Sequence, residues 1–104
     1  MKYRTVYITT SNKEEAQRIG KELVAARLVA CVNIFDGINS FYWWEGEIQE
    51  DHETVIIAKT KQPLMEELIE KVNELHAYDV PCIVSWPIRE AHQDYIDWID
   101  KETK

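Results

Sequence analysis

Apolar and polar residues follow one another along the chain in blocks whose period changes, and three of these blocks have the spacing of a helix. Two long blocks begin at Lys13 and Gln62, and a shorter one covers residues 92–101. Their apolar positions recur every three or four residues, which lines up side chains on one face of a helix. These positions are Ala16, Ile19, Leu23 and Val24; Leu64, Leu68, Val72 and Leu75; and Tyr95, Trp98 and Ile99. The pattern predicts three amphipathic helices.

The segments between the helical blocks are rich in β-branched and aromatic residues, which is typical of strands. They predict strands at residues 3–9, 30–44, 47–60 and 80–86. Asp36-Gly37 allows a bend or bulge inside the second strand. Glu45-Gly46 supplies a hairpin turn to the third strand. The two hairpin strands are about 15 residues each, against the usual five or six.

Local signals mark where the helices and the last strand begin or end. Ser11 and Glu14 have the spacing of a capping box, so we expect the first helix to begin there. Pro63 suits the first turn of the second helix, where its missing N–H costs nothing. Pro87 closes the last strand. His92 and Asp94 are interpreted as a cap of the last helix, with a metal-ligand role as an alternative.

The element order, β-α-β-β-α-β followed by a helix, predicts a single α+β, ferredoxin-like domain over residues 1–104 with an antiparallel sheet and a long hairpin. Right-handed crossovers place the first and third strands in the centre and the second and fourth at the edges. Pro81 and Pro87 suit an edge strand. Cys31 and Cys82 then lie on opposite edges, about 14 Å apart. A disulfide cannot span that distance, so both thiols are expected to be free.

The hairpin carries four consecutive aromatic residues, Phe41, Tyr42, Trp43 and Trp44. Consecutive residues of a strand face opposite ways, so this segment presents apolar surface on both sides. One side can contact the subunit's own helices, and the other requires a partner if the edge is not to aggregate. Alternatively, Tyr and Trp tolerate half exposure and only cover the turn. The pattern favours an oligomer, with these four residues at the interface, but does not choose between a dimer and a trimer.

The composition narrows the classes of partner that the protein is expected to bind. Nineteen acidic and twelve basic residues give a net charge of -7, which disfavours nucleic acid because such binding depends on cationic side chains that neutralise phosphate. The charge could attract metal cations, although solubility is the more common reason for such a charge. No apolar run approaches the roughly 18 residues of a membrane span. We expect a cytoplasmic protein that binds neither nucleic acid nor membrane.

His76 is the leading candidate metal ligand, because histidine is the commonest protein ligand for metals. Its alternative role is a cation at a helix C-terminus, stabilised by the macrodipole. An acidic run on the hairpin follows no known ligand spacing and is interpreted as a solvated surface that includes an exposed His52; it comprises Glu45, Glu47, Glu50, Asp51 and Glu53. The two cysteines could bind Cu(I), but such residues are more often small buried hydrophobes.

A second candidate site is a cleft between subunits. We expect Thr9 and Lys59 at equivalent ends of the two central strands, near Tyr78, where a small anion or metabolite could bind. The alternative is that Lys59 contacts a carboxylate of a neighbouring subunit. No Cys-x-x-Cys, phosphate-binding glycine loop or Gly-x-Ser-x-Gly motif is present, and these absences favour a protein that is not an enzyme.

Several segments together resemble the CutA family, the divalent-cation tolerance proteins. Tyr42-Trp43-Trp44-Glu45-Gly46 is similar to that family's Tyr-x-Trp-x-Gly hairpin signature. Further matches follow in the same order at residues 8–10, 28–33, 58–60, 75–81 and 94–99. The resemblance covers nearly the whole chain.

The resemblance implies a ferredoxin-like subunit in a tight homotrimer, closed by long hairpins from neighbouring subunits and shaped like the PII signalling proteins. It also implies a response to divalent metals, copper in particular, with no obligatory cofactor and no established catalytic activity. Some bacterial members carry Cys where this chain has Thr9, and His-His where it has Leu75-His76. Two of those three candidate ligands are therefore absent here.

Three hypotheses about function follow. The first is a trimeric protein that is not an enzyme and serves in divalent-cation tolerance, with Cu(II) or another divalent cation as its ligand. The second is a PII-like signalling module that binds a metabolite between subunits and acts on an unidentified protein partner. The third is a trimeric scaffold without a ligand.

Overall fold

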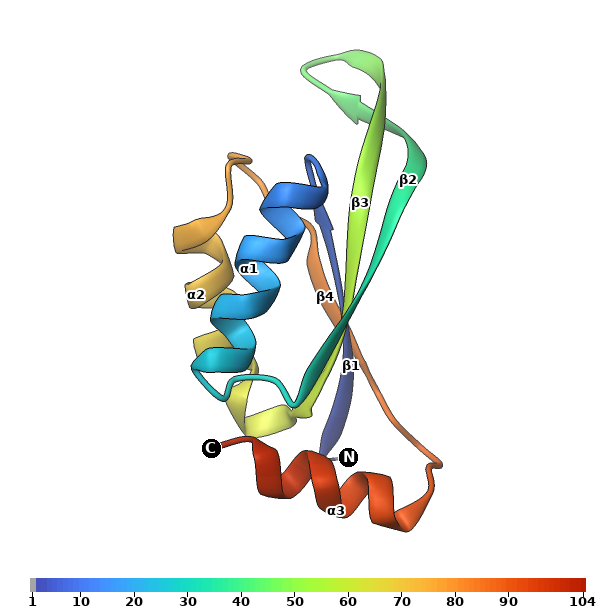
Figure 1. Ribbon diagram of the computed structural model, residues 1–104. Helices are drawn as coiled ribbons and strands as arrows, with labels where there is room; N and C mark the ends of the chain where they lie inside the picture. Colours follow the sequence, from blue (N-terminus) through green and yellow to red (C-terminus); the bar gives the residue numbers. More distant parts are fainter. Residues whose placement is uncertain (1) are drawn as a thin grey trace.

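The computed structural model describes residues 2–104, which form a four-stranded antiparallel sheet with two helices on one face (Figure 1). The strands are β1 (Tyr3–Thr10), β2 (Cys31–Trp44), β3 (Glu47–Lys61) and β4 (Ile83–Pro87). The helices are α1 (Lys13–Ala25), α2 (Met65–Leu75), preceded by the 3₁₀ turn η1 (Gln62–Leu64), and α3 (Gln93–Glu102). The predicted ferredoxin-like α+β fold is confirmed. No helix within residues 2–104 is long and apolar enough to cross a membrane.

The strand order across the sheet is β2-β3-β1-β4, so β1 and β3 are central and β2 and β4 lie at the edges, as predicted. All neighbours are antiparallel, with Val6 opposite Ala58 and Ile8 opposite Ile56. Cys31 lies on β2 and Cys82 directly precedes β4, and both thiols are free. The sheet therefore separates the two cysteines as the topology required.

The core lies between the sheet and the pair α1 and α2. Alternate side chains of the central strands point toward the helices, because successive strand residues face opposite sides. They pack against the predicted helix stripes in one fully buried cluster that includes Val6, Ile8, Ile56, Ala58, Ala16, Ile19, Leu23, Leu68 and Val72. Val24 was predicted in the same stripe but is 41% exposed. It directly follows Leu23, and one helical step of about 100° turns it away from the sheet.

Two predicted boundaries and one predicted capping interaction are corrected by local hydrogen bonding. The N-cap of α1 is Asn12 rather than Ser11, and its side chain accepts a 2.8 Å hydrogen bond from the Glu15 N–H. β4 begins at Ile83 rather than at residue 80, because the ladder with β1 starts at the pair Ile8 and Ile83. His92 is the residue before α3, but its side chain makes no capping hydrogen bond.

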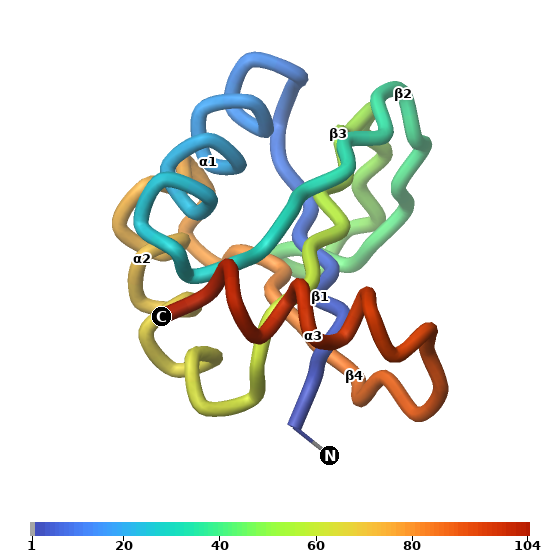
Figure 2. The backbone as a smooth tube through the Cα atoms, turned by 60° about the horizontal axis from the view of Figure 1, so that its bottom comes forward, coloured from blue at the N-terminus to red at the C-terminus, as the bar shows by residue number. Residues whose placement is uncertain are grey.

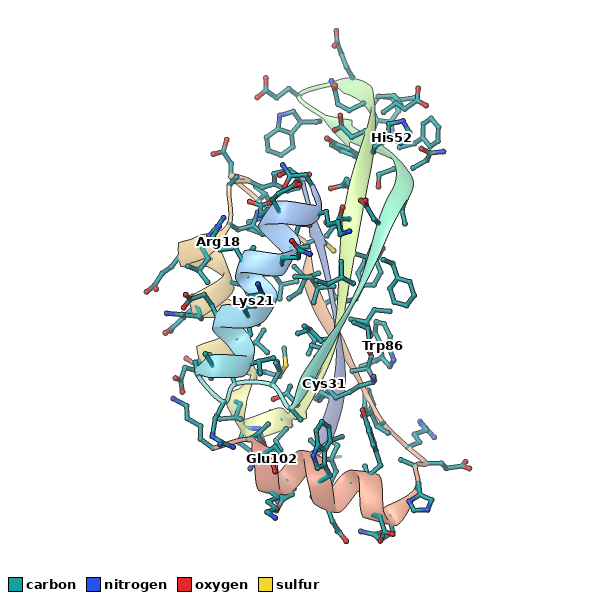
Figure 3. The ribbon with its side chains drawn as sticks, viewed as in Figure 1. Arg18, Lys21, Cys31, His52, Trp86 and Glu102 are labelled. Carbon is teal, nitrogen blue, oxygen red and sulfur yellow. The ribbon has the colours of Figure 1, made fainter. Side chains whose placement is uncertain are left out.

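The other face of the sheet has no helix layer over most of its length (Figures 1 and 2). Figure 3 shows Trp86 on the side of the sheet opposite α1. Phe35, Val84 and Trp86 are 53%, 50% and 46% exposed. α3 covers only one end of the sheet (Figure 1), where the Tyr95 hydroxyl lies 3.4 Å from the Cys31 Sγ atom. We call this uncovered surface the open face.

The β2–β3 hairpin projects beyond the helices and makes the molecule elongated, with extents of 45 × 25 × 23 Å (Figure 1). Glu45 and Gly46 form the turn, and both have positive φ. The predicted bulge at Asp36-Gly37 is confirmed as a register shift between Phe35 and Ile38. The hairpin strands thus match the predicted length, and the four aromatic residues lie toward the projecting end.

Candidate functional site

His76 follows the last residue of α2, and both of its ring nitrogens are engaged within the chain. Its side chain has no solvent-exposed surface. Nδ1 lies 3.0 Å from the Tyr78 peptide nitrogen, and Nε2 lies 2.7 Å from the Thr9 carbonyl oxygen. Because a peptide N–H only donates, Nδ1 is the acceptor and Nε2 carries the proton that is donated to Thr9. The hydrogen bonds select a neutral imidazole.

This geometry bears on the metal role predicted for His76. A metal could coordinate the ring only by displacing Tyr78 or Thr9 from it. In residues 2–104, no group of three or more His, Cys, Asp or Glu side chains could hold a metal ion. A neutral ring also removes the charge on which the macrodipole interpretation rests. Within one chain, His76 acts as a link between the end of α2 and the end of β1.

Glu15 is a buried carboxylate beside His76 that the sequence interpretation missed. Its Oε1 accepts hydrogen bonds from the Ser11 N–H at 2.8 Å and the Ser11 hydroxyl at 2.9 Å. Its Oε2 accepts from the Ala77 N–H at 2.9 Å and lies 3.9 Å from His76 Nδ1. Burial alone would raise the pKa of Glu15, but these hydrogen bonds outweigh it and hold the pKa below the ordinary 4.5. Its position three residues after Asn12 was the available signal, because that is the capping-box position.

Tyr78 connects this network to the hairpin. Its hydroxyl donates a 2.8 Å hydrogen bond to Glu53, and its ring lies 4.7 Å, centroid to centroid, from the His76 ring. Burial and the bond to Glu53 raise the pKa of Tyr78 above its ordinary value, so the hydroxyl stays protonated and remains a donor. Glu53 was grouped with the solvated acidic residues, but it is only 7% exposed. The other four members of that run, Glu45, Glu47, Glu50 and Asp51, are exposed as predicted, and so is His52.

A cavity of about 900 Å³ lies between the hairpin and the segment that follows α2. We call it the hairpin cavity. Thr9 and Tyr78 line it, as the cleft hypothesis expected, and so do Phe41, Tyr42, Trp43 and Trp44. The remaining lining residues are Tyr7, Asn39, Ser40, Glu53, Ala77, Asp79, Val80 and Cys82. Two of the residues predicted for a cleft and the four aromatic residues predicted for an interface therefore line the same cavity.

Lys59 is not part of this cavity, and its predicted placement beside Thr9 is wrong. β1 and β3 are antiparallel, so Thr5 is the residue opposite Lys59, whereas Thr9 is opposite Val55. Four residues of strand separate the two positions, a distance of about 14 Å. Thr9 and Lys59 of one subunit therefore cannot both contact the same small anion.

Comparison with known proteins gives a consistent result over almost the whole chain. A family model described as CutA1 divalent ion tolerance protein matches residues 4–102. The divalent-cation tolerance protein CutA of Pyrococcus horikoshii is 44% identical over 95% of this chain and 96% of its own length. Its counterpart from Thermus thermophilus is 45% identical over 94% of this chain and 95% of its own length. The chloroplastic protein CutA 1 of Oryza sativa is 41% identical over 95% of this chain, which spans 56% of that relative's length.

Solved structures agree with this pattern. CutA1 from Oryza sativa superposes with a TM-score of 0.97 at 39% identity, covering 100% of this chain and 95% of that one. Cut A1 from Thermus thermophilus gives 0.96 at 43% identity, covering 98% and 99%. CutA from Archaeoglobus fulgidus, described as periplasmic, gives 0.95 at 41% identity, covering 98% and 99%.

Proposed function

Because the chain belongs to the CutA1 family of divalent ion tolerance proteins, we propose that it serves in divalent-cation tolerance as a homotrimer that is not an enzyme. The match over residues 4–102 carries this proposal, since its relatives are named for tolerance and not for a reaction. We also propose a cytoplasmic location. The two free cysteines support it, because disulfides are rare in that compartment.

The surface of the subunit supports self-association. The open face exposes about half of the Phe35, Val84 and Trp86 side chains. β2 and β4 are edge strands, each with one row of backbone groups that no other strand of residues 2–104 pairs. Unpaired edges and apolar faces of this kind are normally covered in a native assembly. A dimer that pairs like edges would leave the other edge of each copy free, whereas a closed ring, of three copies in this proposal, could pair β2 of each copy with β4 of the next.

Light scattering at micromolar concentration tests the assembly. We expect a mass of three times the 12.3 kDa of one chain. A folded species with the mass of a single chain, or of two, would contradict the trimer while leaving the family membership intact.

Copper is the metal we propose for this protein, following the sequence resemblance. Residues 2–104 of one subunit contain no preformed group of ligands, so we propose that the trimer builds the copper site where copies meet. Threefold symmetry triples every candidate ligand, which allows an assembly to hold an ion that one chain cannot. His76 is the less favoured ligand, because coordination would require it to give up one of its hydrogen bonds.

Isothermal titration of the metal-stripped trimer with Cu(II), Zn(II) and Mg(II) tests this proposal. We expect saturable Cu(II) binding at a fixed ratio per trimer that persists in His76→Ala. His52→Ala, which removes an exposed histidine, is the control and should also leave Cu(II) binding unchanged. Loss of Cu(II) binding in His76→Ala but not in His52→Ala would contradict this and identify His76 as a ligand. Weak, non-saturating heats would contradict direct copper binding and leave the tolerance role indirect.

The PII-like alternative is less well supported. It relied on an anion held near Thr9 by Lys59, and those residues are four register positions apart. A trimeric scaffold without a ligand remains the hypothesis to which failure of the copper titration would lead.

A further inference from the structure

The hairpin cavity has an unusual lining for a ligand site. Of the residues that line it, six are aromatic and two, Glu53 and Asp79, carry carboxylates. Within the part of the chain that the structure describes, the lining contains no Lys, Arg or His side chain. Its volume of about 900 Å³ is within the usual range for small-molecule sites. Such a surface repels anions and attracts cations.

Glu53 is a buried charge without a counter-ion. Its side chain is 7% exposed, and its hydrogen-bond donor is the Tyr78 hydroxyl at 2.8 Å. Across residues 2–104, no Lys, Arg or His nitrogen lies within 4.0 Å of its carboxylate. A buried carboxylate without a cationic partner is costly. A cation bound in the cavity would remove that cost.

The strand register brings aromatic rings to the same face as this carboxylate. Ile38 lies opposite Glu53, and Ser40 lies opposite Asp51. Every second residue of β2 shares this face, so Tyr42 and Trp44 are on it as well. The Tyr42 hydroxyl donates to the Asp51 carboxylate, which agrees with that placement. Tyr42 and Trp44 are 39% and 40% exposed in a single subunit, and a ligand can bind them only if the trimer leaves these two rings accessible.

The kind of cation follows from what the cavity lacks. A divalent ion held by the protein itself, such as Ca²⁺, takes about six to eight oxygen ligands, and no group of three or more His, Cys, Asp or Glu side chains that could hold a metal ion occurs among the described residues. Aromatic faces instead attract weakly hydrated organic cations, of which methylated ammonium groups are the best known. We propose that the hairpin cavity binds a small organic cation through a methylated ammonium group, with Glu53 as its counter-ion and Tyr42 and Trp44 as its ring walls.

This site is separate from the copper proposal, and it does not depend on metal binding. The cavity is much larger than one ammonium group, so the ligand has room for a further organic part. That part would contact the lining aromatics, whereas the charge would lie near Glu53.

Calorimetric titration of the intact assembly tests the site with three probes at matched ionic strength. Tetramethylammonium chloride presents the charged group, tert-butanol is a neutral molecule of similar size, and sodium phosphate is an anion. We expect saturable binding of tetramethylammonium only. Glu53→Gln keeps an acceptor for Tyr78 but removes the charge, and we expect affinity to fall about tenfold. Glu50→Gln, an exposed carboxylate on the same strand outside the cavity, should leave affinity unchanged.

Trp44→Leu is a second variant, at a half-exposed position that the core does not need, and it should also weaken binding about tenfold. Circular dichroism and light scattering check that each variant is folded and assembled. Equal binding of tert-butanol would overturn the proposal in favour of a purely apolar cavity. Binding of phosphate would overturn it in favour of an anion site. No binding to the assembled wild-type protein would also overturn it, because a side chain of a neighbouring copy would then occupy the cavity.

Discussion

His76 links three segments that are distant in the sequence. Its ring joins the Thr9 carbonyl at the end of β1 to the Tyr78 N–H after α2. Glu15, at the start of α1, holds the neighbouring Ala77 N–H. The His76 and Glu15 side chains are buried, so each depends on these partners for its hydrogen bonds. The network fixes the segment that forms one wall of the hairpin cavity.

The first prediction concerns His76→Ala. The substitution removes a buried ring and leaves the partly buried Thr9 carbonyl and Tyr78 N–H without these partners, so we expect the free energy of unfolding to fall by about 2–3 kcal/mol. His52→Ala, at an exposed position, should change it by less than about 0.5 kcal/mol. Urea denaturation at one fixed protein concentration measures both. Equal effects of the two substitutions would contradict the linking role.

The second prediction concerns pH. The pKa of Glu15 is lower in the folded protein than its ordinary 4.5. The charged carboxylate therefore stabilises the fold fully above that value, and this stabilisation is lost as the pH falls through the folded pKa. Glu15→Gln should cost about 1–3 kcal/mol at pH 7. The difference in the free energy of unfolding between this variant and the wild type should become smaller below about pH 4.5.

Denaturation curves at pH 7 and pH 3.5 measure that difference. Glu14→Gln, at the exposed neighbouring position on α1, should have nearly the same free energy of unfolding as the wild type at both pH values. A deficit of Glu15→Gln that is the same at both pH values would show that the lost stability comes from packing and not from the charge.

At this scale the sequence identified the position of His76 but not its chemistry. Its place directly after a helix was visible in the pattern, because helical spacing is local. Its partners Thr9 and Glu15 lie more than sixty residues away, and only the packing of α1 and α2 on the sheet brings them together. Glu53 was misjudged for the same reason, since its burial depends on Tyr78.

The hairpin is the element that carries most of the candidate function. Its two-residue turn has positive φ at both Glu45 and Gly46, as a type I′ turn requires. The bulge near Gly37 lies between the part of β2 that covers the core and the part that projects. The sequence predicted both features, because turn and bulge signals are local.

The third prediction concerns Gly46→Ala. Its φ of +81° is a conformation that a side chain disfavours, so we expect a loss of about 1 kcal/mol in the free energy of unfolding. Nothing lies within 4 Å of an added Cβ, so steric overlap would not add to that cost. Glu47→Ala, the next residue, is the matched control and should change stability by less than about 0.5 kcal/mol. Thermal unfolding of both variants at equal concentration measures the difference.

Strand alignment was harder to predict than strand existence. The positions of Thr9 and Lys59 within their strands were correct, but their relative placement was not, because pairing direction and register follow from the whole sheet. The start of β4 was misplaced because residues 80–82 have strand-like composition but lie before the first pair with β1.

The whole molecule has one covered face and one open face, and the proposed trimer depends on that asymmetry. Phe35 on the open face and Ile69 on α2 are 53% and 42% exposed in a single subunit. Both positions are apolar and exposed to a similar degree, so they differ mainly in the face on which they lie. They therefore form a matched pair for testing which surface a partner covers.

The fourth prediction is that Phe35→Glu dissociates the assembly and Ile69→Glu does not. A charge on a buried interface without a partner is unfavourable, so we expect the Phe35 variant to show at least a tenfold weaker association. Sedimentation velocity over a dilution series measures it. Dissociation by Ile69→Glu alone would move the interface to the helix layer.

The central position of β1 has a consequence for synthesis of the chain. β1 is the first strand to be made, yet both of its neighbours, β3 and β4, follow much later in the sequence. Val6 and Ile8 cannot be buried until those strands have been translated, and long-range pairing of this kind is slow. The nascent chain therefore carries an unpaired apolar strand during most of its elongation, which is the state that chaperones recognise. The hairpin, by contrast, pairs two adjacent segments and needs no later part of the chain in order to form.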